Sequence, residues 1–126
     1  MVWTMRKEWQ GELPYPPSVN HYWRRVGGNM VLSKDGRRYK KDVRLRVLAQ
    51  DGNLQLQGRI GVMLEVHPPD SRRRDLDNIC KAVLDALGNA GVYRDDSQIV
   101  LLNLYKMPPV QHGRVECVVY TVEGQE

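Results

Sequence analysis

One regular helical pattern, with a strand pattern on each side, limits the folds open to this chain. Within residues 75–90 the apolar side chains recur at intervals of three and four, the spacing of one helix face. Apolar residues alternate strictly over 59–67, and the segment 98–105 is almost entirely apolar. Strand, helix and strand in succession favour a parallel pair joined by a crossover helix. The apolar run at 98–105 is typical of a central strand that is covered on both faces.

The remaining patterns extend this unit to an α+β fold. We expect a single mixed β-sheet with two main helices, in the order β-α-β-α-β-β, as one domain over residues 1–126. The last two strands are expected to pair as an antiparallel hairpin. The other predicted elements are a first strand at 9–15, an exposed loop or small hairpin at 18–32, a helix at 36–50 with Ser33 as its N-cap, and a last strand at 114–122.

Length and composition narrow the class of protein. A chain of 126 residues is the size of one domain, and its 41% of apolar residues is enough for one core. No apolar run approaches the roughly 20 residues of a membrane helix, and residues 1–10 lack an apolar signal core. Two isolated cysteines then indicate reduced thiols. We therefore expect a cytoplasmic protein without a membrane partner.

The positive charge is modest in total and concentrated in runs. The formal net charge is +4, and thirteen of the nineteen basic residues are arginine, which binds phosphate with two parallel hydrogen bonds. Such runs often serve solubility alone, but three in one small chain favour a polyanionic partner. The runs are Arg24-Arg25, the stretch from Arg37 to Arg46, and Arg72-Arg73-Arg74.

Two aspartates, Asp75 and Asp77, stand at the predicted start of the 75–90 helix, directly after three arginines. One interpretation is structural: Asp75 caps the helix and Asp77 favours the positive end of its dipole. The other is a site for a hard cation, because Mg²⁺ binds carboxylate oxygens and keeps several waters. A capped helix needs no arginine cluster before it, so both interpretations stay open.

Three further polar residues extend this candidate site. Lys81 follows Asp77 by four residues, on the same helix face. It either makes a surface ion pair with Asp77 or stabilises negative charge on a phosphoryl oxygen beside the metal. Asp85 continues the same helix face and is interpreted as structural, pairing with Lys81. Asp96, in the turn before the apolar strand, is either a turn residue or a metal ligand. As a ligand it must reach Asp75 from the next strand or from a second subunit.

Other chemistries find no support in the sequence. There is no glycine-rich nucleotide loop, no Walker motif and no Gly-x-Ser-x-Gly elbow, and the three histidines lack metal-ligand spacing. His67 ends a predicted strand near Asp70 and is interpreted as incidental. Cys80 on the apolar helix face and Cys117 on a strand are interpreted as inert core residues.

A specific combination of motifs runs from Pro68 to Pro108, and a further match at 16–24 precedes it. The motifs are Pro-Asp-Ser-Arg-Arg-Arg-Asp-Leu-Asp-Asn at 69–78, Lys81, Asp85-Ala86-Leu87, Ala90-Gly91, Asp95-Asp96 and Lys106-Met107-Pro108. In this combination the chain resembles the RusA family of Holliday-junction resolvases, which are small Mg²⁺-dependent endonucleases often encoded by phages and prophages. The resemblance covers most of residues 13–122, whereas residues 1–8 have no counterpart.

The resemblance implies a set of site residues. Asp75, Asp77 and Asp96 match the family's metal-binding aspartates, and Lys81 matches its functional lysine. Ser71 interrupts a run that can be wholly basic in this family, a departure that bears only on the strength of DNA binding. The residues expected to hold DNA are Arg72, Arg73, Arg74, Arg37, Arg38, Lys40, Lys41 and Arg44.

The resemblance also implies an activity: a homodimer that resolves a four-way DNA junction by paired symmetric nicks, with Mg²⁺ as the cofactor and Mn²⁺ as a substitute. It places the protein in a bacterial or phage-infected cell, in DNA recombination and repair. Two alternatives stay open. One is a basic nucleic-acid-binding module without catalysis, and the other is a nuclease acting on other branched DNA, such as flaps or forks.

Overall fold

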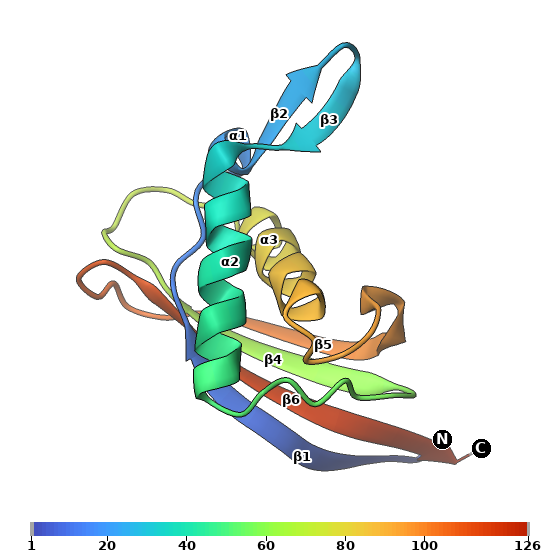
Figure 1. The fold of residues 1–126 in the computed structure, drawn as a ribbon. Coiled ribbons are helices and arrows are strands. Elements are labelled where there is room, and N and C mark those ends of the chain that lie inside the picture. The colour runs from blue at the N-terminus through green and yellow to red at the C-terminus, as the bar shows by residue number, and fades with distance from the viewer. Residues whose placement is uncertain (1, 126) are drawn as a thin grey trace.

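A computed structural model describes residues 2–125 of the chain. Its two main helices and its mixed sheet confirm the predicted α+β fold and the order of the main elements (Figure 1). The elements are β1 (Val2–Leu13), α1 (Val19–Tyr22), β2 (Trp23–Val26), β3 (Asn29–Leu32), α2 (Lys34–Ala49), β4 (Ile60–His67), α3 (Leu76–Asn89), a 3-10 turn η1 (Asp96–Gln98), β5 (Ile99–Lys106) and β6 (Arg114–Gln125).

The main sheet has the strand order β1-β6-β4-β5. Strands β4 and β5 are parallel, as the strand-helix-strand pattern predicts. The predicted hairpin of the last two strands is wrong, because β6 lies between β1 and β4 and is antiparallel to both. The 107–113 connection therefore carries the chain across β4 instead of turning it back beside β5.

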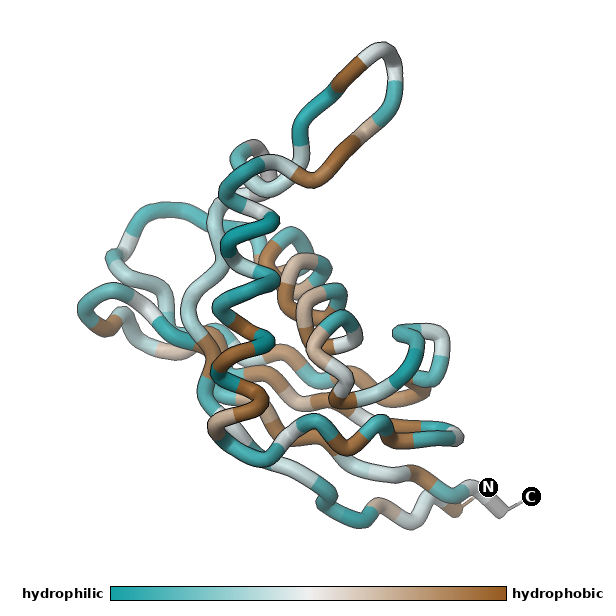
Figure 2. Tube along the Cα trace, in the orientation of Figure 1, coloured by the Kyte–Doolittle hydropathy of each residue, from teal (hydrophilic) through white to brown (hydrophobic). Residues whose placement is uncertain are grey.

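Helices α2 and α3 lie on the same face of this sheet (Figure 1). Ser33 caps α2 as predicted, because its side chain accepts a hydrogen bond from the Gly36 N–H. The apolar residues at helical spacing in this segment are Tyr39, Val43, Val47 and Leu48; the first three are buried in the core, whereas Leu48 is 51% exposed. In Figure 2 the hydrophobic segments gather in the strands and in the parts of the helices that face them.

Strand β5 forms an edge of the sheet, so its prediction as a central strand is wrong. Val100, Leu102 and Tyr105 are between 41% and 49% exposed. The apolar run is therefore not a sign of coverage on both faces here. Strand β6, which carries apolar side chains on both faces, is one of the two inner strands, beside β4.

The N-terminal strand is longer than its apolar pattern indicates. β1 begins at Val2 instead of residue 9 and pairs with β6 along its whole length, with one irregularity at Lys7/Trp9. The loop after it contains the small hairpin considered for 18–32, formed by β2 and β3, which projects beyond the helices (Figure 1). No helix within residues 2–125 is both long and apolar enough to cross a membrane.

Candidate active site at the N-terminus of helix α3

A cleft of about 510 Å³ opens at the N-terminus of α3. One wall is the proline-rich segment 15–18, and the other contains Arg73, Arg74, Asp75 and Asn78. Sequence segments that are more than fifty residues apart therefore meet where the arginine run leads into the helix. Cationic side chains, carboxylates and a helix N-terminus in one cleft are suited to a phosphate group with a metal ion.

Asp75 is the N-cap residue of α3 by position, but its side chain makes no capping hydrogen bond. The structural interpretation of Asp75 as a side-chain cap is therefore wrong. Asp77 lies in the first turn, and both carboxylates are exposed. Neither makes an ion pair within residues 2–125, and the predicted pair of Asp77 with Lys81 is absent there. Two free carboxylates beside a cleft fit a hard divalent cation.

Asp70 organises the loop that leads into this helix. Its Oδ1 accepts a hydrogen bond from Arg74 Nη1 over 2.7 Å, and the Arg74 guanidinium lies over the Tyr15 ring at 5.8 Å. The Arg74 hydrogen bond, with one from the Arg72 N–H, lowers the pKa of Asp70 to about 2. Asp70 is not among the predicted site residues, and its spacing of four residues before Arg74 is the sequence signal for this contact.

The three arginines of the run have different surroundings. The Arg74 side chain is only 20% exposed and is held by Asp70, whereas the Arg72 side chain is 83% exposed with a longer contact of 3.5 Å to Asp70. Arg73 is exposed and lines the cleft. Arg72 and Arg73 are therefore available to an external anion, and Arg74 shapes the loop.

Lys81 lies one turn beyond Asp77, with its Nζ 5.5 Å from the centre of the Trp23 ring. The predicted pairing of Lys81 with Asp85 is wrong. Asp85 Oδ2 instead lies 3.1 Å from Lys40 Nζ and accepts a hydrogen bond from the Tyr22 hydroxyl. The pKa of Tyr22 is raised, mainly by burial and also by the nearby charge of Asp85. The hydroxyl therefore keeps its proton and donates it to the hydrogen bond with Asp85.

Asp96 lies at the other end of α3. It faces a hollow of about 280 Å³ with Asp85, Asn89 and Asp95. Asp95 caps η1 by accepting a hydrogen bond from the Ser97 N–H. The pKa of Asp96 is raised, first by its hydrogen bond with Asp95 and then by desolvation and by repulsion from neighbouring carboxylates. Asp85 follows Asp77 by eight residues, about 12 Å along the helix axis. A single chain therefore brings Asp75 and Asp77 together but keeps Asp96 apart.

The predicted basic face of α2 is largely exposed. Lys40 is the exception, because it is partly buried in its pair with Asp85. Gly36, Tyr39, Val43 and Val47 turn inward, which leaves the intervening cations outside. The exposed basic residues of the predicted DNA-binding set on this helix are Arg37, Arg38, Lys41 and Arg44.

The two cysteines are core residues, as predicted. Both are buried and free of a disulfide. Burial raises the pKa of the Cys80 thiol to about 11 and raises that of Cys117 as well, so neither is a ready nucleophile.

His67 is also buried, and with Glu65 and Glu116 it forms the one close group of three metal-ligating side chains within residues 2–125.

Comparison with known proteins settles the family. The sequence pattern of the family described as Endodeoxyribonuclease RusA matches residues 14–120, which include both main helices, the cleft, β4, β5 and the first part of β6. The chain belongs to the RusA family. The resemblance to this family is thereby confirmed, and so is the prediction that the protein is a nuclease.

Curated relatives match this RusA chain over nearly its whole length. The crossover junction endodeoxyribonuclease rusA of Enterobacteria phage HK97 is 43% identical over 93% of this chain and 98% of its own. The proteins of that name from Enterobacteria phage 82 and Escherichia coli (strain K12) are 40% identical over 90% of this chain and 94% of theirs. A solved cyclodiphosphate synthase from Plasmodium vivax matches with a TM-score of 0.36 and 15% identity.

Proposed function

We propose that this RusA-family chain is a structure-selective endonuclease that resolves Holliday junctions by paired symmetric nicks, with Mg²⁺ as its cofactor. The observation that carries the proposal is the exposed Asp75 carboxylate, which makes no ion pair within residues 2–125 and lines a cleft beside an arginine run, with exposed Asp77 in the first turn of the same helix. The names of its relatives support the junction as the substrate. The whole of residues 1–126 acts as one endonuclease domain in the cytoplasm of a bacterial or phage-infected cell.

Asp75 and Asp77 are the residues that hold the metal in this proposal. They supply oxygen ligands only, which suits Mg²⁺, with Mn²⁺ as a substitute. Held by these carboxylates, the ion would supply polarisation of the scissile phosphate and activation of a water. Arg73, on the same wall of the cleft as Asp75, orients a phosphate oxygen, and the positive end of α3 favours the same anionic group.

Asp96 completes the metal site in this proposal. In the chain as described it lies beside Asp85, so it joins Asp75 and Asp77 only if the 94–98 turn moves or if a second subunit supplies it. Lys81 has an aromatic neighbour and no carboxylate partner among the ion pairs of residues 2–125. Its ammonium group is therefore free to stabilise negative charge that develops on the phosphate.

DNA strands are held by the exposed cations on two elements. Arg72 and Arg73 lie at the cleft, and the outer side of α2 presents a second row. These contacts bind phosphates and position the strand, but they read no base sequence. Selectivity for a branched substrate then depends on the relative position of the two rows and of two active sites.

A homodimer is part of the proposal, because a four-way junction is two-fold symmetric and offers two equivalent strands. The sheet face opposite α2 and α3 carries no helix (Figure 1). Strand pairing places Met5, Met63, Val118, Tyr120 and Val122 on that face. Val118 and Val122 are already buried by their neighbours, so Met5, Met63 and Tyr120 present the apolar surface that a second copy of the chain would cover.

A panel of substrates tests the proposed selectivity. A synthetic four-way junction, a flap, a replication fork and a linear duplex are compared in Mg²⁺ at equal concentration. We expect the junction to be cut at least tenfold faster than any other substrate. Preference for the flap or fork would replace the junction with another branched DNA, and binding without cleavage of any substrate would leave only a nucleic-acid-binding module.

A further inference from the structure

Three glutamates lie side by side across the sheet, on the face opposite the helices. The pairing of β6 with its two neighbours places Glu116 opposite Glu12 on one side and opposite Glu65 on the other. Directly paired residues share one face, so all three carboxylates are on the face without helices. Like charges in such a row destabilise a sheet unless a cation lies among them.

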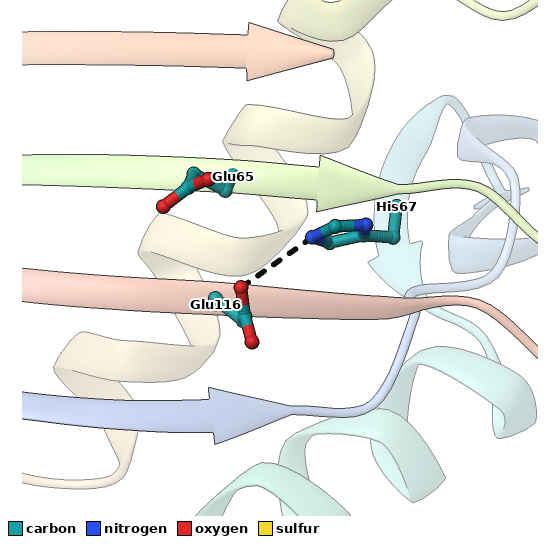
Figure 3. A group of neighbouring side chains, drawn as sticks. All are labelled: Glu65, His67 and Glu116. Atoms are coloured by element: carbon teal, nitrogen blue, oxygen red, sulfur yellow. Dashed lines mark ion pairs between the residues drawn. The ribbon is translucent and has the colours of Figure 1, made fainter. Parts of the chain in front are cut away.

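His67 lies next to this row with unsatisfied hydrogen-bonding groups. Its side chain is only 10% exposed, and neither ring nitrogen has a hydrogen-bond partner. Figure 3 shows the ring directed at Glu116, with its Nε2 3.4 Å from Glu116 Oε2. Burial of an imidazole without a hydrogen bond is costly, so this side chain calls for a further partner.

The geometry matches a metal centre with three protein ligands. One donor atom from each of Glu65, His67 and Glu116 lies within 4.8 Å of the other two. In a zinc site each ligand atom lies about 2.0–2.2 Å from the ion, so the ligand atoms are somewhat less than 4.8 Å from one another. Small rotations of the three side chains therefore bring the donor atoms to binding distance. Arg114 Nε lies 3.5 Å from Oε1 of Glu116, which leaves Oε2 for the ion.

We propose that Glu65, His67 and Glu116 bind a borderline divalent transition-metal ion of the Zn²⁺ type. An imidazole with two carboxylates suits Zn²⁺, whereas Mg²⁺ prefers oxygen ligands alone. The site joins the end of β4 to β6 and lies on the opposite side of the sheet from α3. It is therefore separate from the proposed Asp75 and Asp77 site, and it does not depend on the proposed function.

Zn²⁺ binding by the full chain tests this proposal without an activity measurement. The double variant Asp75→Asn, Asp77→Asn removes the other carboxylate pair and serves as the parent. Calorimetry on the parent is expected to show one Zn²⁺ per chain, and Zn²⁺ but not equimolar Mg²⁺ is expected to raise its Tm. Substitution of Co²⁺ is expected to give the visible absorption of a ligand set that contains nitrogen.

Adding His67→Ala to the parent is expected to weaken Zn²⁺ binding at least tenfold and to abolish the rise in Tm. His21→Ala, which removes an exposed imidazole on α1, is the matched control and is expected to change neither. If His67→Ala does not fold, the isosteric Glu65→Gln replaces it with the same expectation. Absence of Zn²⁺ binding by the folded parent, or unchanged binding in the His67 and Glu65 variants, would leave only an ion pair of His67 with Glu116.

Discussion

Arg74 and Asp70 form a 2.7 Å charged hydrogen bond that spans the loop between β4 and α3. Arg74 Nη1 also donates to the carbonyl oxygens of Asp70 and Arg72, so one guanidinium closes the turn. The loop ends at Asp75, and the pair therefore fixes the position from which the two candidate metal ligands project. A contact outside the proposed catalytic set thus determines the shape of the cleft.

The pH dependence of Asp70 follows from this contact. Its pKa of about 2 lies below the usual 3.8, so the pair stabilises the fold above pH 3.8 and this contribution is lost as the pH falls toward 2. NMR titration of the carboxyl carbons is expected to show Asp70 titrating near 2 in the wild type. Arg74→Ala is expected to return the pKa toward 3.8, and an unchanged value in that variant would contradict the role of Arg74.

Lys81→Ala is expected to reduce the single-turnover cleavage rate at saturating protein by at least tenfold, with little change in junction affinity. The reason is that Lys81 acts on charge that develops in the transition state. Lys41→Ala, on the exposed side of α2, is the matched comparison and is expected to lower affinity and the salt slope instead. A tenfold loss of affinity in Lys81→Ala at an unchanged saturated rate would make Lys81 a phosphate anchor only.

Asp96→Asn is expected to abolish cleavage while the junction still binds, because the amide keeps the shape and removes a charged ligand. Mixing Asp96→Asn chains with Asp77→Asn chains then locates the ligand. Recovery of cleavage in the mixture places the partner's Asp96 in the site, and no recovery places Asp96 in the same chain. Normal cleavage by Asp96→Asn alone would remove it from the metal site.

Light scattering at micromolar concentration is expected to give about twice the 14.6 kDa chain mass. Tyr120→Asp, on the sheet face without helices, is expected to shift the protein to monomers and to uncouple the two nicks. Leu48→Asp, at an exposed position of α2, is the control and is expected to leave the mass unchanged. A wild-type monomer that still makes both nicks almost simultaneously would contradict the dimer.

The sequence predicts well those elements whose patterns are local. The α3 helix and β4 each have a regular apolar period, and the structure begins and ends them within one or two residues of the prediction. The places of β5 and β6 are set by pairing between distant segments, on which local periodicity carries no information. The same holds for residues 2–8, whose strand exists because β6 lies beside it.

The candidate site shows the same division. Asp75 and Asp77 are neighbours in sequence and remain neighbours in space, so their shared location was predictable. Asp70 and Tyr15 enter the site through contacts with Arg74 that a linear reading does not reveal. His67 was interpreted as incidental because only Glu65 is near it in sequence, whereas Glu116 is brought beside it by the pairing of β4 with β6.

The most direct test is single-turnover cleavage of a synthetic four-way junction, mapped at nucleotide resolution on all four strands. In Mg²⁺ the wild type is expected to nick two opposing strands at symmetric positions. Asp77→Asn is expected to bind the junction without cutting it, whereas Asp42→Asn, an equal change of charge on α2, is expected to cut normally. Near-normal cleavage by Asp77→Asn at saturating Mg²⁺, or no Mg²⁺-dependent cleavage by the wild type, would contradict the account.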